Sequence, residues 1–250
     1  MKTYIISLKN AHERRRYISH QASSSGIDFE IIDAVNGKEI TENMLQILAK
    51  DYSYAITPGE IGCTLSHLIA YKQLLVSGNE FALILEDDVL IPENLADTLH
   101  SLKKNMTKDK PCVYLLSKVN HYNSKKLSAV SNTASIHEVY NAAFSHAYII
   151  NRKAAQKLLE NLFPVWCVAD QWTTFREFGL VQLYGVIPAC IHTNPEFESI
   201  TTIENRGRDE TKKAKAEAWK KTRAARPLSI KIAKTLDLLF NRPFQKIIKQ

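Results

Sequence analysis

The nine-residue run FALILEDDV, from Phe81 to Val89, constrains the fold more than any other part of this 250-residue chain. Five uninterrupted apolar residues are typical of a strand that is covered on both faces, as in α/β proteins. Three acids follow, and a buried carboxylate is costly unless a positive group lies beside it. Ligands of open α/β sheets bind outside the carboxyl ends of the strands. We therefore expect a binding site at Glu86, Asp87 and Asp88.

The first 35 residues predict a strand, a helix and a second strand. Residues 3–8 and 28–35 are short segments rich in β-branched and aromatic residues, and polar or glycine-containing turns bound them. Residues 10–27 between them are predicted to form a helix that ends near Gly26. This order of elements favours parallel pairing of the two strands in an α/β sheet.

A long helix is predicted directly before the apolar strand. Thr57, Pro58 and Glu60 form the pattern of a capping box with proline at the first helical position. Apolar residues then recur at helical spacing until Gly78, a typical residue after the end of a helix. We assign Glu60 to the cap of this helix rather than to the binding site.

The alternation of strands and helices continues along the chain. Short segments rich in β-branched and aromatic residues predict strands, and apolar residues at helical spacing predict helices. The predicted strands are residues 113–116, 134–140, 144–150 and 180–187, and the predicted helices are residues 151–162 and 171–178. The pattern as a whole predicts an α/β protein with a largely parallel sheet.

Positive charge is concentrated at the C-terminal end of the chain. The net charge is +7, but residues 211–250 hold nine Lys and three Arg against two acids, so that residues 1–210 are net negative. After Pro227, apolar residues at helical spacing alternate with lysines, which predicts a cationic amphipathic helix of the kind that lies on anionic membranes. A contact between two copies of the chain, in a homodimer, is the alternative. Nucleic-acid binding is not expected, because no recognition motif or interleaved aromatic residues accompany the charge.

Cysteine spacing and hydropathy indicate the compartment. The four cysteines are scattered without CxxC or metal-ligand spacing, which predicts reduced thiols. The apolar run at the N-terminus is too short for a signal peptide, and no segment approaches the ~18 consecutive apolar residues of a membrane-spanning helix. We therefore expect a cytoplasmic protein that is peripheral on the inner face of the cytoplasmic membrane.

The three acids are expected to alternate in direction, because successive side chains of a strand point to opposite faces. Glu86 and Asp88 should then point to one side and Asp87 to the other. A divalent cation would neutralise such a pair and take oxygen ligands from it. In the alternative interpretation, Asp87 or Asp88 only caps a turn before Pro92 and faces solvent.

Five segments between residue 1 and about residue 200 form a combined pattern. They are ISLKNAHERR, FEIIDAVNGKEI, GEIGCTLSHLIAYKQLL, LILEDDV, and AAFSHAYIINRKAAQKLLE followed by Asp170. In this order they resemble glycosyltransferase family 25, bacterial enzymes that add sugars, commonly galactose, to lipooligosaccharide. The resemblance implies a GT-A-like, Rossmann-like fold with a mixed, mainly parallel sheet flanked by helices. Residues 1–205 would then form the nucleotide-sugar-dependent catalytic domain, and residues 206–250 a basic helical C-terminal tail.

The same resemblance implies roles for four residues. The EDD sequence corresponds to a DxD-like motif that holds Mn²⁺ or Mg²⁺ against the diphosphate of a UDP-sugar. Asp88 would bind the cation directly, and Glu86 directly or through water. His192 would be a further metal ligand, although a surface loop histidine explains it equally well. Asp170 would be the catalytic base that takes the proton of the acceptor hydroxyl; its alternative role is the N-cap of the helix that follows.

Residues near the ends of the first two strands are predicted to contact the donor. Arg14 is the best candidate for a phosphate contact, and a solvated basic helix face is its alternative. His67 lies on the capped helix that the resemblance places under the donor, and a hydrogen-bonded core histidine is the alternative. The complete set of predicted donor contacts is Ser7, Leu8, Arg14, Ala34, Val35, His67, Asp87, Asn205 and Arg206.

The resemblance therefore implies an inverting, metal-dependent hexosyltransferase. It would transfer galactose from UDP-galactose in β-linkage to a terminal sugar of a lipooligosaccharide or lipopolysaccharide acceptor. UDP-glucose or a UDP-N-acetylhexosamine stays open as the donor, because one side chain of a pocket can select the orientation of one hydroxyl group. The acidic cluster is also compatible with a metal-dependent nucleotide-sugar phosphohydrolase, which needs no acceptor, and with a non-catalytic carbohydrate-binding protein, which releases no UDP.

Overall fold

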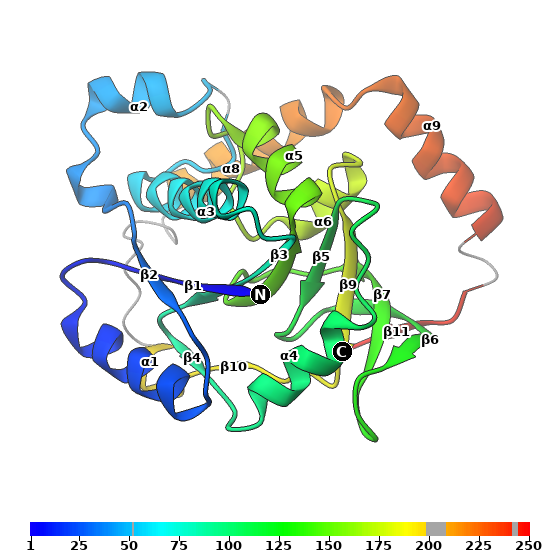
Figure 1. Cartoon of the computed structure of the whole chain (residues 1–250). Coiled ribbons are helices and arrows are strands. Elements are labelled where there is room, and N and C mark those ends of the chain that lie inside the picture. The colour runs from blue at the N-terminus through cyan, green and yellow to red at the C-terminus, as the bar shows by residue number, and fades with distance from the viewer. Residues whose placement is uncertain (52, 199–208, 242–244) are drawn as a thin grey trace.

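A computed structural model describes residues 1–51, 53–198, 209–241 and 245–250 (Figure 1). Within these residues the chain forms a nine-stranded mixed sheet, a separate two-stranded sheet, and helices on both faces of the large sheet. The sequence-based prediction of an α/β fold with a mixed sheet flanked by helices is thereby confirmed. Three pairs of strands in the large sheet are parallel (β1 with β2, β1 with β3, β5 with β9), and the other pairs are antiparallel.

The order of strands in the large sheet is β11-β6-β7-β9-β5-β8-β3-β1-β2. Its strands are β1 (Lys2–Ser7), β2 (Glu30–Asp33), β3 (Phe81–Glu86), β5 (Cys112–Leu115), β6 (His121–Ala129), β7 (Ser135–Asn141), β8 (Ala147–Asn151), β9 (Gln182–Ile187) and β11 (Ile247–Lys249). The small sheet pairs β4 (Val89–Leu90) with β10 (His192–Thr193) in antiparallel orientation. β3 therefore lies between the parallel strand β1 and the antiparallel strand β8.

Helices cover both faces of the sheet. They are α1 (His12–Ser24), η1 (Gly37–Glu39), α2 (Glu42–Leu48), α3 (Pro58–Ser77), α4 (Leu95–Lys103), α5 (Arg152–Leu162), α6 (Trp172–Glu177), α7 (Pro195–Glu198), α8 (Asp209–Ala224), α9 (Leu228–Leu236) and the π-helical turn η2 (Asp237–Asn241). In Figure 1, α3 and α5 lie above the sheet, and α1 and α4 lie below it.

β3 is buried on both faces, as its apolar sequence predicted. Ala82 and Ile84 belong to the hydrophobic core under α3 and α5, whereas Leu83 and Leu85 belong to the core on the side of α1 and α4. All four side chains are fully buried. Because the strand alternates between two cores, a shift of its register by one residue would exchange the two sets of side chains.

The start of α3 confirms the predicted capping box. Thr57 Oγ1 accepts a hydrogen bond from Glu60 N (3.2 Å), and Glu60 Oε2 accepts one from Thr57 N (3.3 Å). At the other end, Gly78 has φ +73°, a left-handed conformation that glycine adopts without a steric penalty. The helix therefore has fixed ends, and it presents His67 from its buried face.

The C-terminal part of the chain packs on the rest of the protein at several places. Lys215 of α8 forms an ion pair with Glu60, and Trp219 packs against Tyr54 with ring centroids 5.6 Å apart. After η2 the chain returns to the sheet as β11, which pairs antiparallel with β6. This part of the chain contains the helical segments α8, α9 and η2, and it ends in the strand β11, whereas the sequence predicted only helix for residues 206–250.

All four cysteines are free thiols. Cys112 and Cys167 are buried, and burial raises the pKa of the Cys112 thiol to about 11. Among the described residues, no helix combines the length and the hydropathy that a membrane span requires.

Substitution of Lys215 by methionine should destabilise the protein. The Lys215 and Glu60 side chains are 14% and 1% exposed, and the substitution removes the ammonium group from beside a buried carboxylate, which is costly. Glu60 keeps two backbone N–H donors, so we expect the free energy of unfolding to fall by about 2 kcal/mol, measured by urea unfolding of the full chain. Lys212→Met is the control, because the pair of Lys212 with Asp209 is exposed and should contribute less than about 0.5 kcal/mol. Equal effects of the two substitutions would contradict the proposed docking of α8.

Candidate functional site

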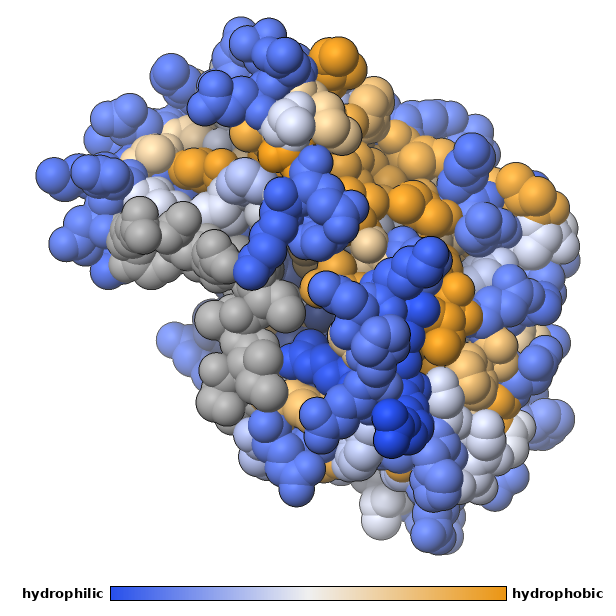
Figure 2. Space-filling model, turned by 90° about the vertical axis from the view of Figure 1, so that its left-hand side faces the viewer, coloured by the Kyte–Doolittle hydropathy of each residue, from blue (hydrophilic) through white to orange (hydrophobic). Residues whose placement is uncertain are grey.

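A pocket of about 690 Å³ lies at the carboxyl ends of β1, β2 and β3. This is the position at which open α/β sheets bind ligands. Figure 2 shows the face of the molecule that carries α1 and α2, and this face is hollowed near its centre between hydrophilic and hydrophobic side chains. The pocket is lined by residues from β1, α1, α3, the end of β3, the segment before β8, and β10. It therefore collects polar groups from segments that lie far apart in the sequence.

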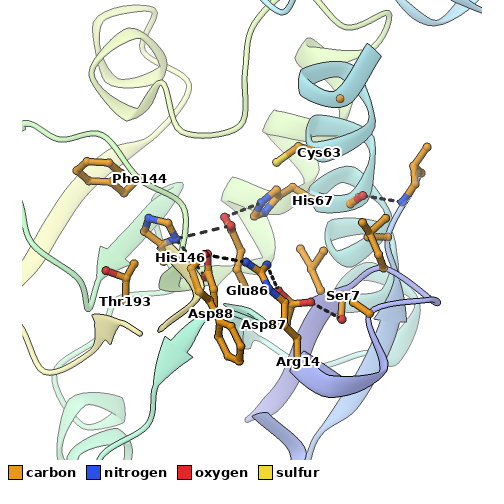
Figure 3. A pocket seen from close by; sticks show the side chains of 18 of the residues that line it. Ser7, Arg14, Cys63, His67, Glu86, Asp87, Asp88, Phe144, His146 and Thr193 are labelled. Carbon is orange, nitrogen blue, oxygen red and sulfur yellow. Dashed lines mark hydrogen bonds and ion pairs between the residues drawn. The ribbon is translucent and has the colours of Figure 1, made fainter. Parts of the chain in front are cut away.

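Asp87 points toward α1 and is compensated within the protein (Figure 3). Ser7 Oγ donates a hydrogen bond to Asp87 Oδ2 (2.5 Å), and Arg14 Nη1 donates one to Asp87 Oδ1 (2.9 Å). Burial, together with the neighbouring Asp88 carboxylate, raises the pKa of Asp87, although Ser7 and Arg14 lower it. Ser7, Arg14 and Asp87 thus connect β1, α1 and the end of β3, and this cluster holds the Arg14 guanidinium at the edge of the pocket.

Glu86 and Asp88 point to the other side, toward two histidines (Figure 3). His146 Nδ1 lies 3.4 Å from Asp88 Oδ1 and 3.7 Å from Glu86 Oε2. His67 Nε2 lies 3.4 Å from Glu86 Oε1, which also accepts a hydrogen bond from Ser145 Oγ (2.5 Å). The expected alternation of the three acids is observed.

The charges of this group depend on one another. Burial raises the pKa of Glu86, but the imidazoles of His146 and His67 lower it by more, and it lies well below its usual range. Burial lowers the pKa of His146, but Asp88 and Glu86 raise it to about 10. The imidazolium of His146 is therefore the positive group that compensates Glu86 and Asp88 when no cation is bound.

The same three residues fit a divalent cation. A carboxylate oxygen of Glu86, one of Asp88 and a ring nitrogen of His146 lie within 4.8 Å of one another. Asp88 Oδ1 and His146 Nδ1 are buried and form no hydrogen bond with the described residues. Oxygen and imidazole ligands suit Mn²⁺, whereas Mg²⁺ prefers oxygen ligands alone. A cation would replace the proton of His146 as the compensating charge, because a metal-bound imidazole is neutral.

His67 is both a hydrogen-bonded core residue and part of the pocket. Its side chain is buried, and its Nδ1 lies 2.7 Å from the hydroxyl oxygen of Tyr148, which is 2.9 Å from that of Tyr71. Burial raises the pKa of both tyrosines, so their hydroxyl groups stay protonated. The two interpretations of His67 are therefore compatible, because the hydrogen bond orients its ring toward Glu86.

The other predicted site residues occupy different places. Leu8, Ala34 and Val35 line the pocket, as do Ser7 and Arg14. His192 on β10 also lines it, but this residue is outside the group formed by Glu86, Asp88 and His146.

Of the predicted site residues that the structure describes, Asp170 is the one that does not line the pocket. The N-cap of α6 is Gln171, not Asp170. The role of Asp170 as a base stays a prediction. Asn205 and Arg206 lie outside the described residues.

Sequence reasoning missed the residues before β8. Phe144, Ser145 and His146 all lie in the FSHAY sequence, which was recognised only as a matching segment. His146 reaches the acids because β8 runs antiparallel to β3, and Glu86 N donates a hydrogen bond to His146 O (2.8 Å). A histidine at the start of a predicted strand was the available signal, but the neighbour of that strand was not known.

The family of the chain follows from its similarity to known proteins. The model of glycosyltransferase family 25 (LPS biosynthesis protein) matches residues 1–173, which is more than half of the chain. The chain belongs to glycosyltransferase family 25. The resemblance that the sequence motifs indicated is thereby confirmed.

Three relatives of this family 25 protein show how far the similarity extends. Human procollagen galactosyltransferase 2 is 28% identical over 168 residues, which cover 62% of this chain and 27% of the relative. Lipooligosaccharide biosynthesis protein lic2B of Haemophilus influenzae is 34% identical over 92 residues, 36% of this chain and 35% of the relative. Lacto-N-neotetraose biosynthesis glycosyltransferase LgtE of Neisseria meningitidis serogroup B is 28% identical over 197 residues, which cover 71% of this chain and 68% of the relative. The chain thus spans about a quarter of the human relative and a third of the Haemophilus relative.

Manganese binding should depend on His146 rather than on His192. His146→Ala removes a ligand, so we expect the affinity for Mn²⁺ to fall at least about tenfold in isothermal titration of the protein without donor. His192→Ala is the matched control and should leave the affinity within about twofold, because His192 lies outside the group. A larger loss of Mn²⁺ affinity in His192→Ala than in His146→Ala would place the metal at β10 instead.

Proposed function

We propose that this family 25 protein is a metal-dependent glycosyltransferase that takes a hexose from a nucleotide sugar and adds it to a glycan. The observation that carries the proposal is the juxtaposition of Glu86, Asp88 and His146 in a pocket at the carboxyl ends of three strands. Membership of the family supports a nucleotide-sugar donor and a glycan acceptor. A cation held by these residues would stabilise the negative charge that develops on the diphosphate leaving group.

Different residues of the pocket would contact different parts of the nucleotide sugar. The ends of β1 and β2 supply Leu8, Ala34 and Val35, which we propose as the surface for the uridine. Arg14, fixed by Asp87, adds a positive charge beside the proposed diphosphate position. Hydrogen bonding by buried side chains preorganises such a site before substrate arrives, which lowers the cost of reorganisation during the reaction.

The metal-binding carboxylates are also held in place. Ser145 and His67 both contact Glu86 Oε1, so that this oxygen is oriented from two sides. Asp170 stays the predicted base for the acceptor hydroxyl. If it has this role, Asp170→Asn should lower kcat without changing Mn²⁺ binding.

We propose galactose from UDP-galactose as the transferred sugar and a terminal sugar of a lipooligosaccharide or lipopolysaccharide as the acceptor, with inversion to a β-linkage. The names of the relatives support this choice: one is a procollagen galactosyltransferase, one a lipooligosaccharide biosynthesis protein, and one a glycosyltransferase of lacto-N-neotetraose biosynthesis. UDP-glucose and UDP-N-acetylhexosamines are the alternative donors, because pockets separate such sugars by single contacts.

Release of UDP from a panel of UDP-sugars tests this function. We expect release that requires both an acceptor glycan and Mn²⁺, that EDTA abolishes, and that Asp88→Asn lowers at least about 100-fold in kcat/KM. Glu93→Gln, an acidic residue outside the pocket lining, is the control and should keep full activity. UDP or sugar phosphate released without an acceptor would identify a phosphohydrolase. Glycan binding without any release of UDP would identify a carbohydrate-binding protein.

We also propose that α9 and η2 attach the protein to the inner face of the cytoplasmic membrane. Their exposed apolar side chains include Leu228, Ile232, Leu236, Leu239 and Phe240. Residues 211–250 hold nine Lys and three Arg against two acids, which complements an anionic lipid surface. An acceptor anchored in a membrane would then lie close to the enzyme.

The membrane proposal predicts binding to vesicles that contain phosphatidylglycerol and not to vesicles of phosphatidylcholine alone. The double substitution Leu236→Glu and Leu239→Glu should lower vesicle binding at least about tenfold, because it places charge in the apolar surface. Val76→Glu on α3, where the side chain is also exposed, is the control and should change nothing. A dimer in ultracentrifugation that the double substitution dissociates, without vesicle binding, would show that the surface contacts a second copy.

A further inference from the structure

Phe144 combines a strained backbone with an exposed aromatic ring. Its φ is +77°, and it is the one non-glycine residue with positive φ among the described residues. A bulky side chain is unfavourable in this left-handed conformation, and such strain concentrates at functional sites. The side chain is 48% exposed, although burial would stabilise a phenylalanine. The backbone conformation and the exposure of the ring are thus both unfavourable for the stability of the protein.

Hydrogen bonds on both sides hold this segment in its strained form. Phe144 O accepts a hydrogen bond from Nε1 of the fully buried Trp172 (2.9 Å), and Ala142 N donates one to Thr173 Oγ1 (3.2 Å). On the other side, Ser145 Oγ donates to Glu86 Oε1. The segment is therefore tied to α6 and to the metal-binding carboxylate at the same time.

The ring is part of the pocket. It stacks on the His146 imidazole with centroids 5.4 Å apart and an interplanar angle of 22°. Of the large hydrophobic side chains that are exposed in the described part of the chain, Phe144 is the one that lines this pocket. Stacking on a side chain of the metal group fixes the distance between the ring and the position of the proposed cation.

The position of Phe144 in the pocket indicates which part of a substrate it meets. In Figure 3, Ser7 and Arg14 lie on one side of Glu86 and Asp88, and Phe144 lies on the other side, next to His146. With the uridine at β1 and the diphosphate at the acids, Phe144 is at the end where the sugar is transferred. The C–H groups of one pyranose face are apolar and pack well on an aromatic ring.

We propose that Phe144 is a stacking platform for a pyranose ring at the transfer end of the pocket, and that its strained backbone holds the ring in that place. The proposal rests on the proposed transferase function. The pyranose is either the terminal sugar of the acceptor or the hexose of the donor, since both must lie at this end for transfer.

Steady-state kinetics of Phe144→Ala separate the two sources. A platform for the acceptor raises the KM for the acceptor at least about tenfold and leaves the KM for the donor within about twofold, whereas a platform for the donor hexose gives the reverse. Phe144→Trp should keep both KM values within about threefold of the wild type. Mn²⁺ affinity should be unchanged in both variants, which shows that His146 remains in place. Phe163→Ala is the matched control, because Phe163 is 47% exposed and lies outside the pocket lining.

Binding of methyl β-galactopyranoside and methyl β-glucopyranoside, observed by ligand NMR with Mn²⁺ and UDP present, tests the platform without turnover. Loss of binding in Phe144→Ala but not in Phe163→Ala supports it. Unchanged binding and unchanged KM values in Phe144→Ala overturn it. A wild type that binds these sugars but never transfers one would refute the proposed function and leave the platform standing.

A glycine at position 144 tests the role of the strain. Phe144→Gly removes the steric strain of the left-handed conformation, so the urea concentration at the midpoint of unfolding should be equal to or higher than that of the wild type. Sugar binding should be lost as in Phe144→Ala. Phe163→Gly should lower the midpoint, because position 163 has φ −111° and gains only flexibility. A lower midpoint for Phe144→Gly than for Phe163→Gly would show that Phe144 serves stability instead.

Discussion

The compensation of three adjacent carboxylates at the end of a buried strand is the constraint on which the rest of the site depends. β3 ends at the pocket, where Asp87 is buried and Glu86 and Asp88 are largely shielded from solvent, so all three acids need positive or hydrogen-bonding partners. Asp87 finds them in Ser7 and Arg14, which ties β1 and α1 to β3. Glu86 and Asp88 are left with the histidines and, in our account, with a metal. The same electrostatic requirement therefore shapes both the fold around β3 and the chemistry of the pocket.

His146 connects the two states of the site. Without a cation, the two carboxylates raise its pKa to about 10 and keep it charged. With a cation, its ring nitrogen is available as a neutral ligand. The acids would thus be compensated in both states, by the proton of His146 in one and by the cation in the other. Through its stacked neighbour Phe144, the same histidine relates the metal position to the proposed sugar platform.

Local signals in the sequence predicted local structure well. The capping box at Thr57 and the apolar run before Glu86 follow from short-range chemistry, and both are confirmed. The alternation of the acids follows from strand geometry. The partners of the acids depend on which strands are neighbours, and the antiparallel insertion of β8 between β3 and β5 is set by tertiary packing. His146 and Phe144 were therefore not identified, although the segment that holds them was recognised as a family motif.

Anomalous diffraction at the manganese edge, from crystals grown with Mn²⁺ and UDP, tests the central claim most directly. We predict one strong peak within coordination distance of Glu86 or Asp88 and of His146, in contact with the diphosphate. A peak at His192 without His146, or a diphosphate bound by Arg14 with no metal at the acids, would contradict the account.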